Sequence, residues 1–448
     1  MKQTMIPHPE QLERESSETC ADLLRFIDDS PTPYHVSKQV ADRLTQAGFV
    51  ACRFEDDFCA LPAGHGFFIA EDAAVFAFVK PKMRVHAFRI VGAHTDSPNL
   101  RLKPRPLYEK AGYVQVGVEV YGGALLHTWL DRDLRLCGRA IVRDGNGCLQ
   151  SKLVSLREPI VRIPQLAIHL DREVSEKGLQ LNRQEHLAPI VGLQEPGKTG
   201  VDEKLLKTLC AKELACSATD IVQLDLHVAD AVPSTVAGLS REFVFAPRLD
   251  NLAMCHAGLS ALLRARSQGS ESGVVQVLAL FDHEEVGSVS DRGADSALLS
   301  QLLERISGSS GCSAEQHQQA VARSLCVSAD MAHGVHPNYA DRHEPHHKPL
   351  LNRGPVIKFN AQQRYATSAK TAAHMMELAR RARIPLQEYV HRTDLPCGST
   401  IGPRLSAHVG IPTVDVGNPM LSMHSAREMA GAHDPEQMSR LLALFFLS

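Results

Sequence analysis

Histidine and carboxylate side chains follow several short apolar segments of this 448-residue chain. In chain order they are His94, Asp250, the neighbouring pair Glu284 and Glu285, Asp330 and His424. Imidazole nitrogens and carboxylate oxygens are ligands that zinc accepts, and one carboxylate can bridge two ions through its two oxygens. Such a set can give each of two divalent ions one histidine, one terminal carboxylate and a share of a bridging carboxylate. One member of the glutamate pair then stays free as a general base for hydrolysis.

Each of these residues also has an ordinary structural interpretation. Asp250 stands where it could cap a helix, and paired glutamates after a strand often form a solvated helix start. The sequence His94-Thr95-Asp96 could be a simple hydrogen-bonded pair, but Asp96 could also hold the second ring nitrogen of a metal-bound imidazole. The combination of so many metal-binding side chains, rather than any one of them, favours a two-metal site.

The apolar segments before these residues are expected to be strands of one sheet. Short, largely β-branched runs cover residues 85–93, 274–281, 325–329 and 412–416, and a further strand is expected at 386–391. Apolar residues recur with helical spacing at 21–26, at 36–44 and again from Asp250 onwards. Strands that alternate with helices predict an α/β fold with a mixed, mainly parallel sheet flanked by helices. Ligands bind beyond the carboxyl ends of such strands, which would gather the histidines and carboxylates in one crevice.

Residues 98–232 have a different pattern, in which short alternating runs are separated by turns. The runs cover 113–121, 136–142 and 149–156, and the sequence Asp-Gly-Asn-Gly at 144–147 predicts a hairpin between the last two. We therefore expect a mostly antiparallel β domain at 98–232, inserted between an N-terminal part (1–97) and a C-terminal part (233–448) of the α/β domain. The polar stretches 194–204, 264–273 and 307–319 are expected to be surface loops.

Composition excludes several classes of protein. The formal net charge is −3 and the basic residues are scattered, so the chain lacks the basic face of a nucleic-acid-binding protein. No segment approaches the ~20 apolar residues of a membrane span, and residues 1–20 lack the apolar centre of a secretory signal. The 11 cysteines form no CxxC pair, which argues against a cysteine-based zinc site. We expect a cytoplasmic protein with reduced thiols and with neither a nucleic-acid nor a membrane partner.

Long segments of the chain resemble the aspartyl aminopeptidases, a branch of the co-catalytic zinc exopeptidases. They run in the family's order from the first strand to the C-terminus: GAHTDSPNLRLKP, YGGALLHTWLDRDLRLCGRA, RIPQLAIHL, PRLDNL, FDHEEVGS, SADMAHGVHPNY, GPVIKFNAQQRYAT and NPMLSMHSAREMAGAHD. Motifs of this length are highly specific. The resemblance implies a zinc-exopeptidase fold, removal of the N-terminal residue of peptides that have a free N-terminus, and two Zn²⁺ ions per subunit. Carboxylate-rich sites also accept Co²⁺ or Mn²⁺, so these ions are alternatives.

The resemblance also implies roles for individual residues. The metal ligands that it implies are His94 and Asp330 for one zinc ion, Glu285 and His424 for the other, and Asp250 as the bridge. Glu284 would be the general base, and Asp96 would orient His94. Lys358 would pair with an acidic side chain on the first residue of the substrate, so that Asp and Glu are preferred. His169 would reach the active site of a neighbouring subunit, the inserted domain would form a dimer, and dimers would assemble into a homo-dodecamer.

Other interpretations stay open on the sequence alone. Lys358 could be a solvated lysine on a strand, and His169 a core or interface histidine. Residues 170–204 and 307–319 match no segment of the family pattern, so their roles are open. A deacylase or carboxypeptidase-type hydrolase, or an aminopeptidase that prefers neutral residues, could use the same two metals. An inert, metal-stabilised assembly protein is a further alternative, against which the spare carboxylate of Glu284 argues.

Overall fold

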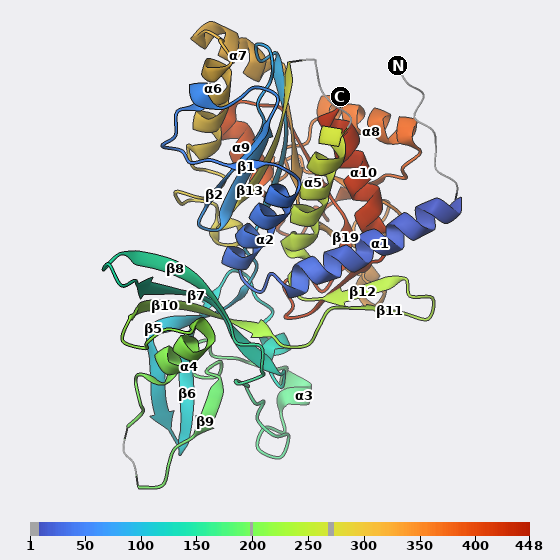
Figure 1. The fold of residues 1–448 in the computed structure, drawn as a ribbon. Coiled ribbons are helices and arrows are strands. Elements are labelled where there is room, and N and C mark those ends of the chain that lie inside the picture. Colours follow the sequence, from blue (N-terminus) through green and yellow to red (C-terminus); the bar gives the residue numbers. More distant parts are fainter. Residues whose placement is uncertain (1–8, 198–199, 268–272) are drawn as a thin grey trace.

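The expected mixed α/β architecture forms in the computed structural model, which describes residues 9–197, 200–267 and 273–448 (Figure 1). Its largest element is a nine-stranded sheet. In order across this sheet the strands are β1 (Val50–Ala51), β2 (Gly66–Glu71), β3 (Ala74–Val79), β13 (Val274–Phe281), β4 (Ala87–His94), β14 (Leu325–Ala329), β18 (Thr413–Gly417), β16 (Val356–Phe359) and β17 (Gln387–Val390).

The centre of this sheet is parallel and buried on both faces. Strands β13, β4, β14 and β18 run parallel, while β3 and β16 join them in antiparallel pairs. On β4, Phe88 and Ile90 enter one apolar layer, whereas Val91 and Ala93 enter the other. Burial on both faces explains why these strands read as nearly continuous apolar runs. The predicted strands at 274–281 and 325–329 match β13 and β14 residue for residue.

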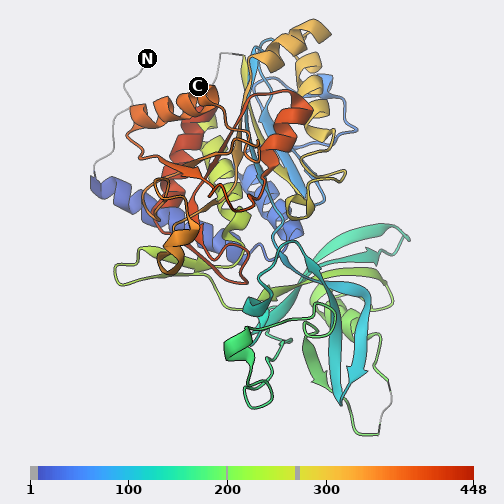
Figure 2. The same ribbon diagram turned by 180° about the vertical axis from the view of Figure 1, so that it is seen from behind.

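Helices cover both faces of the nine-stranded sheet (Figures 1 and 2). One apolar layer includes side chains from α1 (Pro9–Asp28), α2 (Pro33–Gln46), α5 (Leu249–Ser267), α8 (Ala369–Ala382) and α10 (Asp434–Phe446). The opposite layer includes side chains from α6 (Leu298–Ser309), α7 (Ala314–Ala322) and α9 (Ile401–Val409). Within the described ranges, no helix combines the length and the apolar composition that a membrane crossing needs.

The prediction of a surface loop at 307–319 is wrong, because this stretch contains the end of α6 and the start of α7. The side chain of Ser313 accepts a hydrogen bond from the backbone of Gln316, whose side chain accepts one from the backbone of Ser313. The polar residues that suggested a loop therefore form a capping box that begins a helix. In the stretch 264–273, α5 continues to Ser267 and residues 268–272 lie outside the described residues. The stretch 194–204 forms no helix or strand where it is described, and residues 198–199 of it are not described.

A second sheet, with six antiparallel strands, is built from residues within 98–232 and lies below the nine-stranded sheet in Figure 1. Its strands, in order, are β8 (Leu149–Ser155), β7 (Leu134–Arg143), β10 (Ile221–Asp230), β5 (Asn99–Lys110), β6 (Tyr113–Tyr121) and β9 (Ile190–Leu193), accompanied by α3 (Val174–Lys177) and α4 (Leu205–Leu214). The predicted hairpin joins β7 and β8, and the side chain of Asp144 accepts the backbone N–H groups of Asn146 and Cys148 in its turn. The role of this part in dimerisation stays a prediction.

A third, smaller sheet brings distant segments of the chain beside the central strands. Its order is β11 (Thr235–Ala237), β12 (Phe243–Ala246), β20 (Glu428–Gly431), β19 (Pro419–Leu421) and β15 (Ala332–His333). Strand β12 leads directly to Asp250, and the connection between β19 and β20 carries His424. This sheet therefore places two of the predicted metal ligands on adjoining segments.

Candidate active site

The predicted histidines and carboxylates lie together beyond the carboxyl ends of the central strands. His94 is the last residue of β4, Asp330 follows β14, and Glu284 and Glu285 lie in a short 3-10 turn after β13. Asp250 lies at the start of α5 and His424 between β19 and β20. All of these residues line one cavity of about 800 Å³. The nine-stranded and five-stranded sheets, rather than nearness in the sequence, thus gather the residues.

Asp250 lies between the two histidines and faces each with a different oxygen. Its Oδ1 is 3.4 Å from Nε2 of His94, and its Oδ2 is 3.4 Å from Nε2 of His424. Asp330 Oδ1 lies 3.6 Å from the same nitrogen of His94, and Glu285 Oε1 lies 3.4 Å from that of His424. Within each of these two trios, the potential ligand atoms lie within 4.8 Å of one another. The two trios share one carboxylate.

The residues of the two trios fit a pair of divalent cations. Oδ1 of Asp250 and Oε1 of Glu285 are buried and have no hydrogen-bond partner in the described part of the chain. A buried carboxylate oxygen without a partner is costly, and a cation beside it removes that cost. The mixture of imidazole nitrogen and carboxylate oxygen suits zinc. The helix-cap interpretation of Asp250 has no support, since neither of its carboxylate oxygens accepts a backbone N–H among the described residues.

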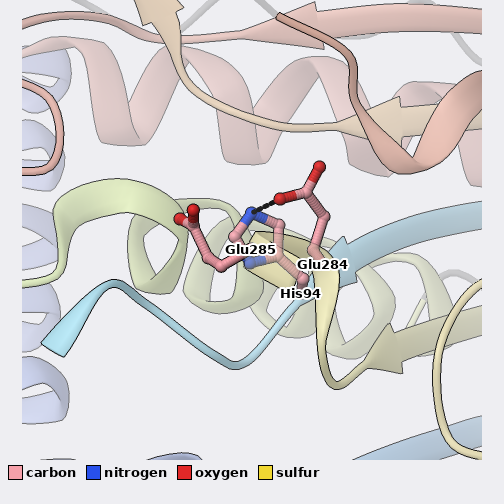
Figure 3. A group of neighbouring side chains, drawn as sticks. All are labelled: His94, Glu284 and Glu285. Carbon is pink, nitrogen blue, oxygen red and sulfur yellow. Dashed lines mark ion pairs between the residues drawn. The ribbon is translucent and has the colours of Figure 1, made fainter. Parts of the chain in front are cut away.

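The two neighbouring glutamates point in different directions. Figure 3 shows their carboxylates on either side of the imidazole of His94. Oε2 of Glu284 lies 4.0 Å from Nε2 of His94, and Glu284 belongs to neither trio that shares Asp250. Burial raises the pKa of Glu284 to about 8, and burial together with the charge of Asp250 raises the pKa of Glu285 well above its ordinary value. Glu285 thus groups with Asp250 and His424, whereas Glu284 belongs to a third group, with His94 and Glu285, whose potential ligand atoms also lie within 4.8 Å of one another.

The histidines balance this concentration of carboxylates. Burial acts to lower the pKa of His424, but its interactions with Asp250 and Glu285 outweigh burial and raise the pKa to about 10. Burial is likewise outweighed at His94, where the nearby carboxylates of Asp250, Asp330 and Asp96 raise the pKa well above its usual value. The raised pKa values of the two imidazoles have one physical cause, which is the negative charge of the carboxylates around them.

Asp96 contacts more of the site than the sequence predicts. The backbone oxygen of Asp96 accepts a hydrogen bond from Nδ1 of His94 at 3.0 Å, and its Oδ1 lies 3.3 Å from that nitrogen. Its carboxylate also accepts the backbone N–H groups of Glu284 and Glu285, each at 3.1 Å, and the hydroxyl of Tyr121 at 2.6 Å. Tyr121 is the last residue of β6 and so brings the six-stranded sheet into contact with the site. Its alternating strand gives no local sign of this contact.

Glu428 is a further buried carboxylate beside the site that the sequence analysis missed. One of its oxygens accepts the backbone N–H of His424 at 2.7 Å, and the other accepts that of Asp250 at 3.1 Å. A signal was available, since Glu428 is an acidic residue four positions after a predicted metal ligand. The ring nitrogen Nδ1 of His424 lies 3.2 Å from the backbone oxygen of Gly123, which leaves Nε2 facing the carboxylates.

Lys358 lines the cavity from β16 and is only 2% exposed, so its interpretation as a solvated lysine is wrong. Its Nζ donates to the backbone oxygens of Asp330 and Met331 at 2.9 and 3.0 Å and lies 3.5 Å from Oδ2 of Asp330. His333 lines the same cavity, and burial, followed by the charge of Lys358, lowers its pKa to about 4. The cavity wall thus combines a fixed ammonium with a neutral imidazole.

His169 does not line this cavity in its own chain. It lies in an exposed turn of the 98–232 segment, so its interpretation as a core histidine is wrong. Its apolar neighbours Leu166, Ile168 and Leu170 are 58%, 51% and 75% exposed. An interface histidine stays a prediction.

Known proteins share both the sequence and the fold. The chain matches the family model described as Aminopeptidase I zinc metalloprotease (M18) over residues 26–446. Its sequence is 42% identical to that of the probable aspartyl aminopeptidase of Ricinus communis over 464 aligned residues. The alignment covers 95% of this chain and 94% of that protein. Its fold matches a chain in the cryo-EM structure of the Ape4 and Nbr1 complex with a TM-score of 0.92, at 39% identity and over 99% of this chain and 87% of that chain.

A second solved structure, the mApe1 dodecamer of S. cerevisiae, matches with a TM-score of 0.84 at 27% identity, over 96% of this chain and 97% of that one. These similarities confirm the family resemblance and the zinc-exopeptidase fold. The chain therefore belongs to the M18 family of zinc metalloprotease aminopeptidases and is a hydrolase of the exopeptidase class.

Proposed function

We propose that this M18 aminopeptidase binds two zinc ions per subunit and prefers peptides that begin with Asp or Glu. The observation that carries the proposal is the shared carboxylate of Asp250, whose two oxygens face two separate histidines. A carboxylate used in this way is what a pair of neighbouring ions requires. A single-metal site would need neither the second histidine nor the second trio.

The two trios supply the ligands. His94 and Asp330 would hold one ion, Glu285 and His424 the other, and Asp250 both. The buried, unpartnered oxygens of Asp250 and Glu285 support this assignment, because they are costly unless a cation lies beside them. Cobalt and manganese accept the same donor atoms, so both are expected to replace zinc in vitro.

Glu284 is proposed as the general base. When bound, the two ions supply the charge that activates a water molecule and the scissile carbonyl. The carboxylate of Glu284 accepts the proton of the attacking water and then donates it to the leaving amine. Burial already raises its pKa to about 8 in the cation-free site, and nearby cations oppose that shift, so its pKa falls towards the range in which a base works at neutral pH. Asp96 holds the backbone of this residue and so orients its carboxylate.

The preference for an acidic first residue is assigned to Lys358. Its ammonium is buried in the cavity wall and donates hydrogen bonds to two backbone oxygens, which fix its position. A substrate carboxylate would add a charge-assisted hydrogen bond, whereas a neutral side chain would displace water from the ammonium without replacing it. The neutral imidazole of His333 can donate or accept a hydrogen bond beside it.

A homo-oligomer built from dimers, extending to a dodecamer, is part of the proposal. The matching mApe1 structure is a dodecamer, and the exposed apolar turn around His169 needs a partner to bury it. In such an assembly, His169 would complete the active site of the neighbouring subunit and help stabilise the developing oxyanion. A cytoplasmic location stays a prediction, and all 11 cysteines are free, which suits a reducing compartment.

The proposal is tested by hydrolysis of aspartyl-, glutamyl-, leucyl- and N-acetyl-aspartyl-p-nitroanilide after chelation and addition of zinc, cobalt or manganese. Metal-dependent activity confined to the aspartyl and glutamyl substrates with a free amine is the expected result. The highest rate on the leucyl substrate would keep the aminopeptidase and refute the role of Lys358. Release of acetate without nitroaniline from the acetylated substrate would indicate a deacylase, and absence of any turnover on all four would indicate an inert site.

A further inference from the structure

We propose that Glu428 is a positioning residue, which holds Asp250 and His424 in the geometry that metal binding requires. The inference rests on the proposed two-metal site, because it concerns two of the residues assigned there as ligands. It differs from that proposal in assigning a role to a carboxylate that would touch neither ion nor substrate.

Glu428 uses both oxygens on the backbone of proposed ligands. Its Oε1 accepts the N–H of His424 at 2.7 Å, and its Oε2 accepts the N–H of Asp250 at 3.1 Å. The side chain is 3% exposed, so water does not compete for these bonds. One buried carboxylate therefore ties together two ligands that are far apart in the sequence.

The small five-stranded sheet places Glu428 where the two ligand segments meet. Glu428 is the first residue of β20 and pairs with Ala246, the last residue of β12. From Ala246 the chain continues through residues 247–249 to Asp250, while the connection before β20 carries His424. The sheet thus fixes the Glu428 backbone, and its side chain reaches across both segments.

Both ligand segments contain backbone conformations that need support. The φ angles of Ser422 and His424 are 58° and 69°, and that of Arg248 is 55°. Side chains other than glycine seldom adopt this left-handed region, because the Cβ atom crowds the backbone. A bond to the N–H of His424 therefore does more than satisfy a donor, since it stabilises the turn that directs the imidazole towards the site.

The same arrangement occurs on the other side of the site. The carboxylate of Asp96 accepts the N–H groups of Glu284 and Glu285, in a loop where His283 and Ser288 also have positive φ angles. Two buried carboxylates thus each hold the backbone of two site residues. Asp96 also contacts the ring of His94, whereas both hydrogen bonds of Glu428 to the described residues come from backbone N–H groups.

Partners that orient metal ligands typically change metal affinity or activity 10- to 100-fold when they are replaced. Glu428→Gln keeps the size of the side chain but places an amide NH₂ against one of the two N–H groups. Asp434→Asn is the matched control. Asp434 is also a buried carboxylate that accepts two backbone N–H groups, those of Asn352 and Gly354 at 2.8 and 3.1 Å, and it does not line the cavity.

The test measures zinc affinity by competition with a chromogenic chelator, together with kcat and KM as a function of added zinc. For Glu428→Gln we expect affinity for at least one zinc ion to fall about 10- to 100-fold, with activity restored by excess zinc. Asp434→Asn is expected to leave the affinity for both zinc ions nearly unchanged, because Asp434 holds the backbone of Asn352 and Gly354, which are not proposed ligands. Equal zinc affinity in wild type and Glu428→Gln would refute the proposal, as would equal losses in both variants.

Glu428→Asp keeps the charge but shortens the side chain, so that it cannot reach both N–H groups. If Glu428→Gln does not fold, reduced zinc affinity in this second variant supports the role, and unchanged affinity refutes it. Failure of both variants to fold in saturating zinc, while Asp434→Asn folds, would assign Glu428 to the fold instead. Failure of the two-metal proposal itself is recognised separately, because the wild-type protein would then not bind two zinc ions.

Discussion

Replacement of Lys358 by Met tests how the enzyme would recognise an acidic first residue. Methionine keeps most of the buried volume but removes the ammonium and its bonds to the backbone oxygens of Asp330 and Met331. A hydrogen bond to a charged group contributes about 1.5–3 kcal/mol. Since 1.36 kcal/mol is a tenfold change in rate, the loss corresponds to about a 10- to 150-fold fall in kcat/KM for the aspartyl substrate relative to the leucyl substrate.

Two features of the structure set where in this range the effect should lie. Lys358 is only 2% exposed, so water screens the charge of its ammonium little, and this favours a large effect. Oδ2 of Asp330, 3.5 Å away, already offsets part of the positive charge and favours a smaller one. We therefore expect a change of about 10- to 50-fold, in the lower part of the range for charged hydrogen bonds.

Lys80→Met is the matched control for the structural cost. Lys80 is also buried, and its Nζ donates to the backbone oxygens of Phe58 and Leu61, each at 2.7 Å, but it does not line the cavity. Both substitutions should lower thermal stability, because each leaves two carbonyls without a donor. Only Lys358→Met should change the ratio of aspartyl to leucyl hydrolysis. An equal loss on both substrates in Lys358→Met would refute the specificity role and leave Lys358 as a support for the Asp330 segment.

Three further predictions concern the assembly, the second sheet and pH. Because His169 is proposed to act in trans, co-expression of His169→Ala and Glu284→Gln chains should restore about a quarter of wild-type activity. Random pairing makes about half of the dimers mixed, and each mixed dimer has one complete site out of two. No recovery of activity would contradict the trans role. Tyr121→Phe removes a hydroxyl from Asp96 and should lower zinc affinity or kcat about 10-fold, whereas Tyr34→Phe, which loses a similar bond to a carboxylate away from the site, should not. Burial raises the pKa of Glu284 from 4.5 to about 8. Between these two pH values, Glu284 therefore loses its proton in the unfolded chain but keeps it in the folded zinc-free protein. Its stability should therefore fall as pH rises towards 8, and zinc binding should release protons in calorimetry; a zinc-free melting temperature that rises over this interval would contradict the sign.

The parallel core and the position of the site follow from local patterns in the sequence. Strands such as β13 are continuous apolar runs because both faces are buried, and each ends at a conspicuous polar residue. Parallel strands place their carboxyl ends at one edge, so the order of histidines and carboxylates along the chain predicts where they meet. The roles of the individual ligands came from the family resemblance, since spacing alone cannot choose which carboxylate bridges.

The roles of the supporting residues do not follow from such patterns, although the position of Glu428 four residues after His424 gave a hint. Tyr121 ends an alternating strand, and its hydroxyl reaches a carboxylate in another sheet only through the packing of the two parts. Glu428 acts through backbone N–H groups, which leave no mark on the sequence of its partners. The error at 307–319 has a different cause, because serine and glutamine favour both loops and helix N-termini, and only the reciprocal bonds of Ser313 and Gln316 decide between them.

The most direct test of the two-metal account is the zinc content and activity of Glu284→Gln beside the wild-type protein. The account predicts two zinc ions per subunit in both, because Glu284 is not assigned as a ligand, together with a loss of kcat of at least about 100-fold, the contribution typical of a general base. Loss of one zinc ion from the variant would show that Glu284 is a ligand. Two zinc ions with nearly unchanged kcat would show that another group transfers the proton. Fewer than two zinc ions in the wild-type protein would contradict the central claim.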